Sequence, residues 1–189
     1  MILSQFRAVG RDLFTRGLVS SHSGNMSIRL GDRIIITRRG SQLGNLEEPD
    51  LVETGINRND RFTPLASVEL PVHRAIYRET PALAIIHAHP PHAVALSMTE
   101  NEIVLDETDD ELCGVGRVPV LGRNMSIRPG ESGDLIAEGL REYRAVLVDG
   151  HGSFTCGQLL EEAYRYTAYL EEKCQVVWLV KTLKRRQAE

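Results

Sequence analysis

The sequence lacks the features of a disulfide-linked, a membrane-spanning or a secreted protein. It holds three cysteines, Cys113, Cys156 and Cys174, which are widely spaced and form no CxxC pair. An odd number of isolated cysteines argues against a disulfide framework and against a thiolate zinc site. No uncharged apolar run approaches the ~20 residues that a bilayer span needs. The N-terminal segment lacks the basic region followed by an apolar region that marks a signal peptide, so we expect a cytoplasmic protein.

No block of basic residues stands out, and neither sign of charge dominates. Lys and Arg number 22 against 26 Asp and Glu, which leaves a net charge of −4 and gives no electrostatic footprint for nucleic acid or an anionic membrane. The hydrophobic share of 42% and the charged share of 25% are typical of globular proteins rather than disordered or fibrous ones. A chain of 189 residues suits one domain, and we expect residues 1–189 to form it.

Apolar residues recur at helical and strand spacings in alternating blocks along the chain. Phe6, Val9, Leu13 and Phe14 predict an amphipathic opening helix that ends before Gly17. The other predicted elements are strands at 34–36, 84–86, 118–121 and 145–148, loops at 18–27 and around 57–64, and helices from about 71 to 77, over 92–98, 132–143 and 159–184, the last with an apolar stripe from 160 to 178. Interleaved strands and helices imply an α/β layer architecture.

Histidines gather at the ends of two predicted strands. Because side chains alternate along a strand, His87 and His89 project to one side while Ala88 points away. His151 follows another apolar strand and stands between two glycines. Three imidazoles with an open fourth position form the usual catalytic zinc pattern. An HxH pair alone more often belongs to ordinary strand residues, but the Pro-Pro that follows it and the glycine-flanked third histidine favour a metal site.

Two glycine-containing loops have the composition of anion-binding sites. In the segment 21–27, Gly24 would let backbone amides approach a ligand, with hydroxyl and amide side chains beside it. Read alone, this segment is more simply an ordinary turn. The segment 37–41 closes the isoleucine-rich strand and adds Arg38 and Arg39, whose guanidinium groups pair bidentately with phosphate. An ordinary strand end exposed to solvent is an equally good interpretation of this second loop.

Glu69 stands among apolar residues just before a predicted helix. Burial in apolar surroundings raises the pKa of a carboxyl group unless a cation or metal lies near, and this is how a general base is tuned. The commoner role of a glutamate in a first helical turn is to complement the helix dipole. The assignment of Glu69 therefore depends on the other motifs.

Taken together, five short motifs resemble those of the class II aldolase/adducin family, and most of all its L-fuculose-phosphate aldolase branch. The resemblance spans nearly the whole chain, from the first helix to about Trp178, and the motifs occur in the family's order and spacing. They are Ser23-Gly24-Asn25-Met26-Ser27, Ile36-Thr37-Arg38-Arg39-Gly40, Ser67-Val68-Glu69, His87-Ala88-His89 and Gly150-His151-Gly152.

The resemblance implies a single-domain α/β/α three-layer fold with a central, largely antiparallel sheet. It also implies a C4 homotetramer whose active sites lie between neighbouring subunits. By resemblance, His87, His89 and His151 bind Zn²⁺, and Glu69 is the catalytic acid/base, able to ligate zinc when substrate is absent. The residues that match the family's phosphate-binding pairs are Gly24 and Asn25, Arg39 and Gly40, and Ser67 and Val68.

The chain departs from the family aldolase at several positions. The family has threonine at Arg39 and serine at Val68, so the phosphate pocket gains a charge and loses a hydroxyl. A family tyrosine that acts on the leaving aldehyde oxygen falls on Thr108 by ungapped counting. A second tyrosine, lent to the next subunit by a C-terminal tail, has no counterpart up to Glu189. These departures leave the aldehyde-side acid/base and the aldehyde specificity unassigned.

The resemblance implies a zinc-dependent lyase of carbohydrate metabolism that cleaves a ketose 1-phosphate to dihydroxyacetone phosphate and an aldehyde by retro-aldol chemistry. Ribulose-phosphate 4-epimerase is an alternative, but epimerases carry aspartate where Glu69 stands, although the run 109–111 lies near a further epimerase aspartate. Methylthioribulose-1-phosphate dehydratase shares the three histidines and a glutamate. A non-enzymatic, metal-free binding module like adducin is disfavoured by the same residues.

Overall fold

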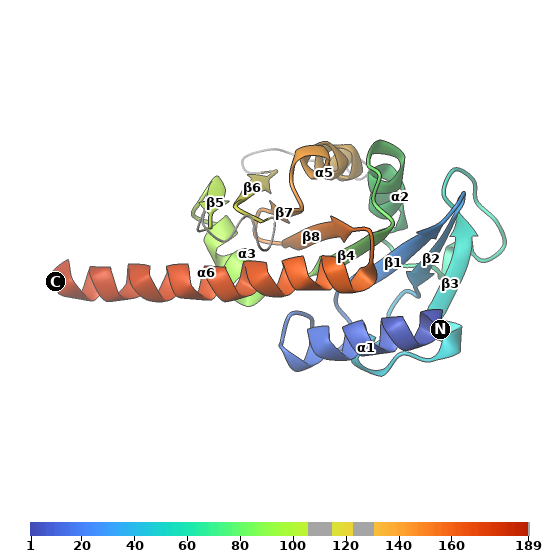
Figure 1. The fold of residues 1–189 in the computed structure, drawn as a ribbon, viewed down its shortest axis with the longest axis horizontal. Coiled ribbons are helices and arrows are strands. Elements are labelled where there is room, and N and C mark those ends of the chain that lie inside the picture. The colour runs from blue at the N-terminus through green and yellow to red at the C-terminus, as the bar shows by residue number, and fades with distance from the viewer. Residues whose placement is uncertain (106–114, 123–130, 189) are drawn as a thin grey trace.

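A central sheet of eight strands organises the molecule (Figure 1). The computed structural model describes residues 1–105, 115–122 and 131–188. Its strands are β1 (Asn25–Leu30), β2 (Arg33–Thr37), β3 (Leu51–Gly55), β4 (Ala84–Ala88), β5 (Glu102–Val104), β6 (Arg117–Leu121), β7 (Ala145–Val148) and β8 (Gly152–Gly157). Their order across the sheet is β3-β2-β1-β4-β8-β7-β6-β5. Neighbouring strands are antiparallel except for β6 and β7, which confirms the expectation of a largely antiparallel sheet.

Helices cover both faces of this sheet (Figure 1). They are α1 (Ile2–Thr15), α2 (Leu70–Glu79), α3 (Pro91–Ser97), α5 (Glu131–Glu142) and α6 (Leu160–Ala188), with short 3-10 helices at Leu43–Asn45, Glu48–Asp50 and Thr63–Leu65. Apolar contacts place α2 and α5 on one face and α1, α3 and α6 on the other. Along β7, Val146 packs toward the first face while Ala145 and Leu147 pack toward the second. The predicted α/β/α layering is therefore confirmed.

The predicted loop at 18–27 is wrong at its end, because strand β1 begins at Asn25. Asn25 and Ser27 are polar yet buried, with exposed fractions of 5% and 0%. Their side chains bond to Glu69 and His73, respectively, beside and on α2. A strand face that is both polar and buried resembles a loop in sequence, because its partners lie far along the chain.

Strands β3, β5 and β8 are not predicted by the sequence pattern, and the composition of β8 shows why. It lies between β4 and β7 in the sheet, and all of its residues are buried. Apart from Phe154, small and hydroxyl-bearing residues fill it instead of the β-branched apolar residues that mark the predicted strands. The hydroxyl of Thr155 is satisfied by helix α6, since Thr155 Oγ1 lies 2.8 Å from Thr167 Oγ1 and 3.0 Å from the Ala163 carbonyl oxygen.

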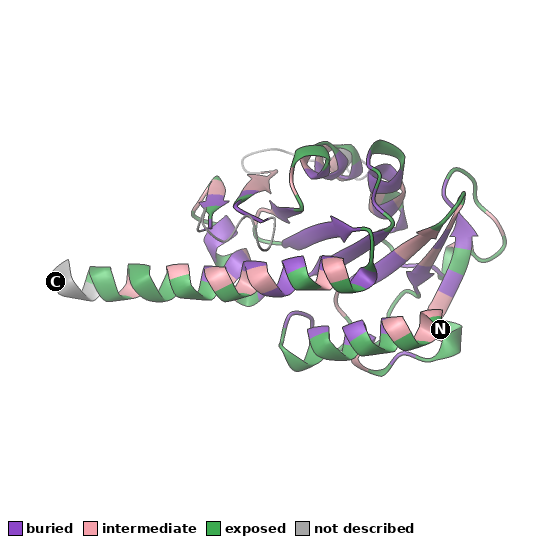
Figure 2. Cartoon of the chain, viewed as in Figure 1, coloured by how far each residue is buried: buried purple, intermediate pink, exposed green. Residues whose placement is uncertain are grey.

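Two helices bury less of their apolar stripe than predicted. On α1, Leu13 is fully buried but Phe14 is 46% exposed. On α6, the buried stripe reaches Cys174, whereas Trp178 is 43% exposed because the helix runs on past the sheet (Figures 1 and 2). Despite its length, neither α6 nor any other described helix is apolar enough to cross a membrane.

Some predicted features fall outside the described residues. Thr108, the acidic run 109–111 and Cys113 belong to this group. The other two cysteines, Cys156 and Cys174, are buried and free.

Candidate active site and metal centre

One cavity of about 300 Å³ brings together every site residue that the sequence predicts. Those residues are Gly24, Asn25, Arg39, Gly40, Ser67, Val68, Glu69, His87, His89 and His151. His22, Ser23 and Arg38 also line the cavity. Of these three, His22 was not a candidate, because an exposed histidine in a loop carries no local signal of function.

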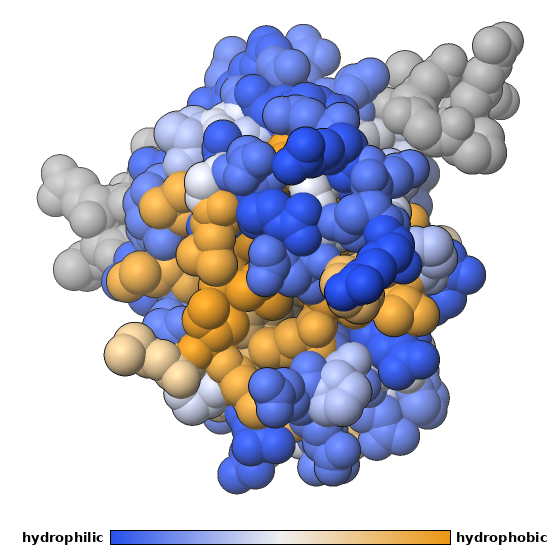
Figure 3. All heavy atoms as spheres, turned by 90° about the vertical axis from the view of Figure 1, so that its right-hand side faces the viewer, coloured by the Kyte–Doolittle hydropathy of each residue, from blue (hydrophilic) through white to orange (hydrophobic). Residues whose placement is uncertain are grey.

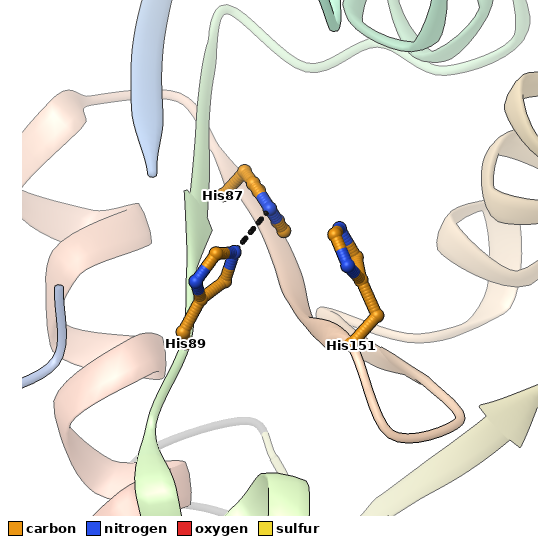
Figure 4. A group of neighbouring side chains, drawn as sticks. All are labelled: His87, His89 and His151. Atoms are coloured by element: carbon orange, nitrogen blue, oxygen red, sulfur yellow. Dashed lines mark hydrogen bonds between the residues drawn. The ribbon is translucent and has the colours of Figure 1, made fainter. Parts of the chain in front are cut away.

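The two strand ends deliver the histidines to a common point. His87 is buried within β4, and His89 follows the last residue of that strand. His151 comes from the turn that joins β7 to β8, where Gly150 takes a φ of +63°. Figure 4 shows the three rings facing one another, and one nitrogen from each lies within 4.8 Å of the others. This group could hold a metal ion.

Two glycines leave the space that the histidines occupy. A Cβ atom on Gly152 would lie 2.7 Å from His89 Cδ2 and 2.8 Å from His87 Cε1. A Cβ atom on Gly24 would lie 2.8 Å from the His87 carbonyl oxygen, and its φ of +76° already favours glycine. Both positions therefore need glycine for the packing around the histidines.

Contacts behind the ring fix the orientation and protonation of His87. Its Nδ1 lies 3.0 Å from the Ser153 carbonyl oxygen, to which it donates, so the neutral ring carries no proton on Nε2. Burial lowers the pKa of His87 to about 3, which keeps the ring neutral at pH 7. The ring stacks on Phe154 at 4.3 Å and on His151 at 5.0 Å between centroids. The Nε2 lone pair is thus held facing the other histidines as a preorganised ligand.

Glu69 lies beside the histidines, at the residue before α2. Its Oε2 is 3.3 Å from His87 Nε2 and accepts a 3.0 Å hydrogen bond from Asn25 Nδ2, while its Oε1 is 3.4 Å from His151 Nε2. Burial opposes ionisation of Glu69, as expected from the sequence. The hydrogen bonds from His151 and Asn25 outweigh that effect and hold the pKa of Glu69 below its ordinary value, so the raised pKa expected for a carboxyl group in apolar surroundings is not found. The carboxylate is therefore anionic at pH 7.

The chemistry of these donors fits a divalent cation. The lone pair on neutral His87 Nε2 faces an oxygen of anionic Glu69 at 3.3 Å, and a cation between them would relieve that repulsion. The Nε2 atoms of His87 and His89 are 2.9 Å apart. Ligands at ~2.0–2.1 Å from tetrahedral zinc lie about 3.3 Å from one another, so a small adjustment would suffice.

The cavity lining also includes cationic and apolar side chains from other segments, which we call the arginine end of the cavity. Arg38 and Arg39 follow the end of β2 and are exposed. His22 Nδ1 lies 3.0 Å from the carbonyl oxygen of Gly40, which tethers the 21–27 segment to the arginine loop. Val68, which is 64% exposed, also lines the cavity. Guanidinium groups next to flexible glycine backbone are suited to an anionic group such as phosphate.

Comparison with known proteins matches the chain to one family. The family model of the Class II Aldolase and Adducin N-terminal domain matches residues 4–178. A crystal structure of L-fuculose-1-phosphate aldolase from Thermus thermophilus is similar to this chain with a TM-score of 0.88 and 37% sequence identity. The match covers 97% of this chain and 95% of that one.

Relatives with other activities are similar as well. A probable bifunctional methylthioribose-1-phosphate isomerase/methylthioribulose-1-phosphate dehydratase from Nocardia farcinica is 31% identical over 92% of this chain, which spans only 35% of that protein. A 3-oxo-tetronate 4-phosphate decarboxylase from Escherichia coli O6:H1 is 29% identical, over 91% of this chain and 84% of the relative.

Proposed function

The chain belongs to the class II aldolase and adducin family, and we propose that within it this protein is a zinc-dependent aldolase. Its substrate would be a ketose 1-phosphate of the L-fuculose 1-phosphate type, cleaved to dihydroxyacetone phosphate and an aldehyde. The observation that carries the proposal is the meeting of Glu69 and three histidines in one cavity that also holds two arginines. The 37% identity with the Thermus thermophilus aldolase supports this reaction over others in the family.

His87, His89 and His151 would hold the metal, and Glu69 could join them when no substrate is present. The fixed lone pair of His87 supports this assignment, because ligand orientation is set before the metal binds. When bound, zinc would act as a Lewis acid on the substrate carbonyl. Class II aldolases are metal-dependent, and the chain supplies a ligand set of the catalytic type, with three imidazoles and an open side.

Glu69 would move the proton at C3 of the substrate. In the direction of synthesis, the carboxylate takes a proton from C3 of dihydroxyacetone phosphate, and the carbon then attacks the aldehyde. In the direction of cleavage, the C4 hydroxyl releases its proton to water and its oxygen becomes the aldehyde carbonyl, while the C3–C4 bond breaks with its electron pair left on C3. The Glu69 carboxyl, protonated from water, then gives its proton to C3. The anionic form that the surrounding contacts favour is the form able to take the proton.

The other end of the cavity would bind the substrate phosphate. Arg39 would give a charge-assisted contact, and backbone N–H groups near the glycines would add neutral ones. The proposed substrate-binding residues are Gly24, Asn25, Arg39, Gly40, Ser67 and Val68, all of which line the cavity.

We also propose that this single domain assembles as a cytoplasmic homotetramer. Apolar side chains gather at the β3 end of the molecule (Figure 3). A hollow of about 330 Å³ there is lined by Leu51, Phe62 and Leu65 together with their neighbours. Because β3 is an edge strand, this end offers both apolar surface and free backbone groups to another subunit. The exposed apolar side chains of α6, Val180 and Leu183 among them, add further surface.

A dehydratase is the second candidate, favoured by the similarity to the Nocardia farcinica protein. It would use the same histidines and Glu69 on methylthioribulose 1-phosphate without breaking a carbon–carbon bond. The glutamate at position 69 disfavours an epimerase, and the preorganised histidine group disfavours a metal-free binding module.

A substrate screen separates these candidates. Zinc-loaded protein is incubated with L-fuculose 1-phosphate, other ketose 1-phosphates and methylthioribulose 1-phosphate, and dihydroxyacetone phosphate is detected by enzymatic reduction with NADH. We expect its release from a ketose 1-phosphate at a rate proportional to enzyme concentration. Loss of water from methylthioribulose 1-phosphate, without dihydroxyacetone phosphate release from any substrate, would establish the dehydratase instead.

A further inference from the structure

Helix α2 and strand β1 meet in a ladder of buried polar side chains below the cavity. Glu69, His73 and Tyr77 follow one another at single-turn intervals, so they share one face of the helix. Asn25 and Ser27 are two residues apart on β1, so their side chains point to the same face of the strand, the one that faces α2. Asn25 Nδ2 donates to Glu69 Oε2 at 3.0 Å, and Ser27 Oγ lies 2.7 Å from His73 Nδ1 and 2.8 Å from the Tyr77 hydroxyl. We call these five residues the polar ladder.

The lower part of the polar ladder is closed to solvent. Ser27 and His73 are 0% exposed, and Tyr77 is 1% exposed. Burial lowers the pKa of His73 to about 4 and raises that of Tyr77, so both side chains are neutral at pH 7. The groups are thus joined by hydrogen bonds between neutral partners.

The hydrogen-bond order in the polar ladder follows from counting donors. If the Tyr77 hydroxyl donates to Ser27 Oγ, the Ser27 hydroxyl can donate to His73 Nδ1, and the imidazole proton lies on Nε2. The reverse order would leave the Tyr77 proton without an acceptor among the described residues. The first order is therefore favoured, and it makes His73 Nδ1 an acceptor.

The polar ladder is not explained by stability alone. His73 Nε2 and Asn25 Oδ1 are buried without a hydrogen-bond partner, and among the described residues they are the side-chain atoms in that condition. Each unmet polar atom costs folding free energy that an apolar side chain of similar size would not. Buried polar atoms without a hydrogen-bond partner are found mainly at functional sites, where the positions of the side chains matter more than stability.

The polar ladder is also connected to the histidine that faces Glu69. Asn25 lies opposite His87 in the pairing of β1 with β4. The His73 ring contacts Phe154 edge-on at 6.3 Å, and Phe154 in turn stacks on His87 at 4.3 Å. His73 therefore connects helix α2, which begins after Glu69, to the Phe154 ring that supports His87.

We propose that His73 is a positioning residue for Glu69. Its bond to Ser27 fixes the first turns of α2 on β1, and this holds the Glu69 carboxylate against Asn25 and next to His87. The effect on rate rests on the proposed function, in which Glu69 moves a proton, whereas the effect on the position of Glu69 does not.

Two variants of similar shape test this role. His73→Asn keeps an acceptor close to the place of Nδ1, while His73→Leu offers none to the Ser27 hydroxyl. In crystal structures of the metal-free proteins, we expect the Asn25 to Glu69 hydrogen bond to persist in His73→Asn and to be lost in His73→Leu. In zinc-loaded protein, His73→Leu should slow C3 proton exchange of dihydroxyacetone phosphate about tenfold with an unchanged KM, and His73→Asn should restore most of the rate.

The outcomes separate positioning from a merely structural role. An unmoved Glu69 in the His73→Leu crystal, or equal exchange rates in the two variants, would overturn the proposal. A wild-type protein that exchanges no proton would contradict the proposed function, while the crystal structures would still decide the role of His73. If His73→Leu does not fold, Ser27→Ala removes the same hydrogen bond with a smaller change in volume, and the same displacement of Glu69 is expected.

Discussion

The two ends of the cavity differ in how firmly their side chains are held. At the histidine end, His87 is 2% exposed, donates to a backbone carbonyl and stacks between two rings. At the opposite end, Arg38 and Arg39 are exposed, and among the described residues no hydrogen bond or ion pair fixes either guanidinium group. The histidine side chains are therefore preorganised, whereas the two guanidinium groups can adjust their positions.

This difference suggests a division of roles along the cavity. Groups that act on reacting atoms need a fixed geometry before substrate arrives, because rearrangement during the reaction raises the barrier. Groups that recognise a charged phosphate tolerate movement, since a guanidinium can approach it from several directions. We therefore expect changes at the histidine end to abolish the reaction and changes at the arginine end to alter substrate affinity.

The largest effect is expected from removal of a metal ligand. Purified protein should carry about one divalent metal per chain, and His89→Ala should abolish both metal binding and activity. Elemental analysis of the dialysed protein measures this directly. His22→Ala is the matched control, because His22 lines the same cavity outside the histidine group, and it should keep the metal. Undiminished metal in His89→Ala would remove the assignment of the ligand set.

Replacement of the proposed base should give the next largest effect. Glu69→Gln keeps the shape of the side chain but takes up no proton at neutral pH, so we expect a rate lower by ~10²–10⁴-fold. Metal content and KM should stay near those of the wild type, because three histidines already form a complete ligand set. Steady-state kinetics and elemental analysis of the same preparation test both points. Loss of the metal together with the rate would make Glu69 mainly a ligand.

At the arginine end, Arg39→Ala should raise KM for the phosphorylated substrate roughly tenfold, because a charge-assisted contact is lost. The turnover number should change much less. Initial rates over a range of substrate concentrations separate the two parameters. Arg11→Ala, which removes an exposed arginine on α1 outside this cavity, is the control and should leave KM unchanged. A KM unaffected by Arg39→Ala would mean that this side chain points to solvent.

The smallest effect is expected from adding a hydroxyl at position 68, in the proposed phosphate pocket. Val68→Ser should lower KM about threefold, the size expected of one neutral hydrogen bond. Val68 is 64% exposed, so the fold should tolerate the change. Val104→Ser, the same substitution at a 52% exposed position of β5 outside the lining of this cavity, controls for a general effect of polarity. An equal fall in KM for both variants would show that the hydroxyl makes no specific contact.

The histidine end was largely predictable from sequence because its rules are local. Alternation along one strand puts His87 and His89 on the same side, and an apolar strand followed by glycine delivers His151. The layered α/β fold likewise follows from alternating periodicities. What brings these separate strand ends into one place is tertiary packing, and for that the resemblance to a family was needed.

The polar ladder could not be predicted because its contacts are distant in sequence. Ser27 and His73 are 46 residues apart, and each looks like an ordinary polar residue in its own segment. The same reason explains why β8 was missed, since Thr155 is satisfied by a helix that follows it. The only local signal was the single-turn spacing of Glu69, His73 and Tyr77, which gains meaning once β1 is known to face that side of α2.

The central claim is that Glu69 moves a proton at C3 beside a metal held by three histidines. Exchange of the C3 proton of dihydroxyacetone phosphate with deuterium oxide tests it most directly, because this half-reaction needs the base and the metal but no aldehyde. Zinc-loaded wild-type protein should incorporate deuterium at C3, and Glu69→Gln with a full complement of metal should not. Exchange at the wild-type rate in Glu69→Gln would show that another residue is the base and would contradict the account.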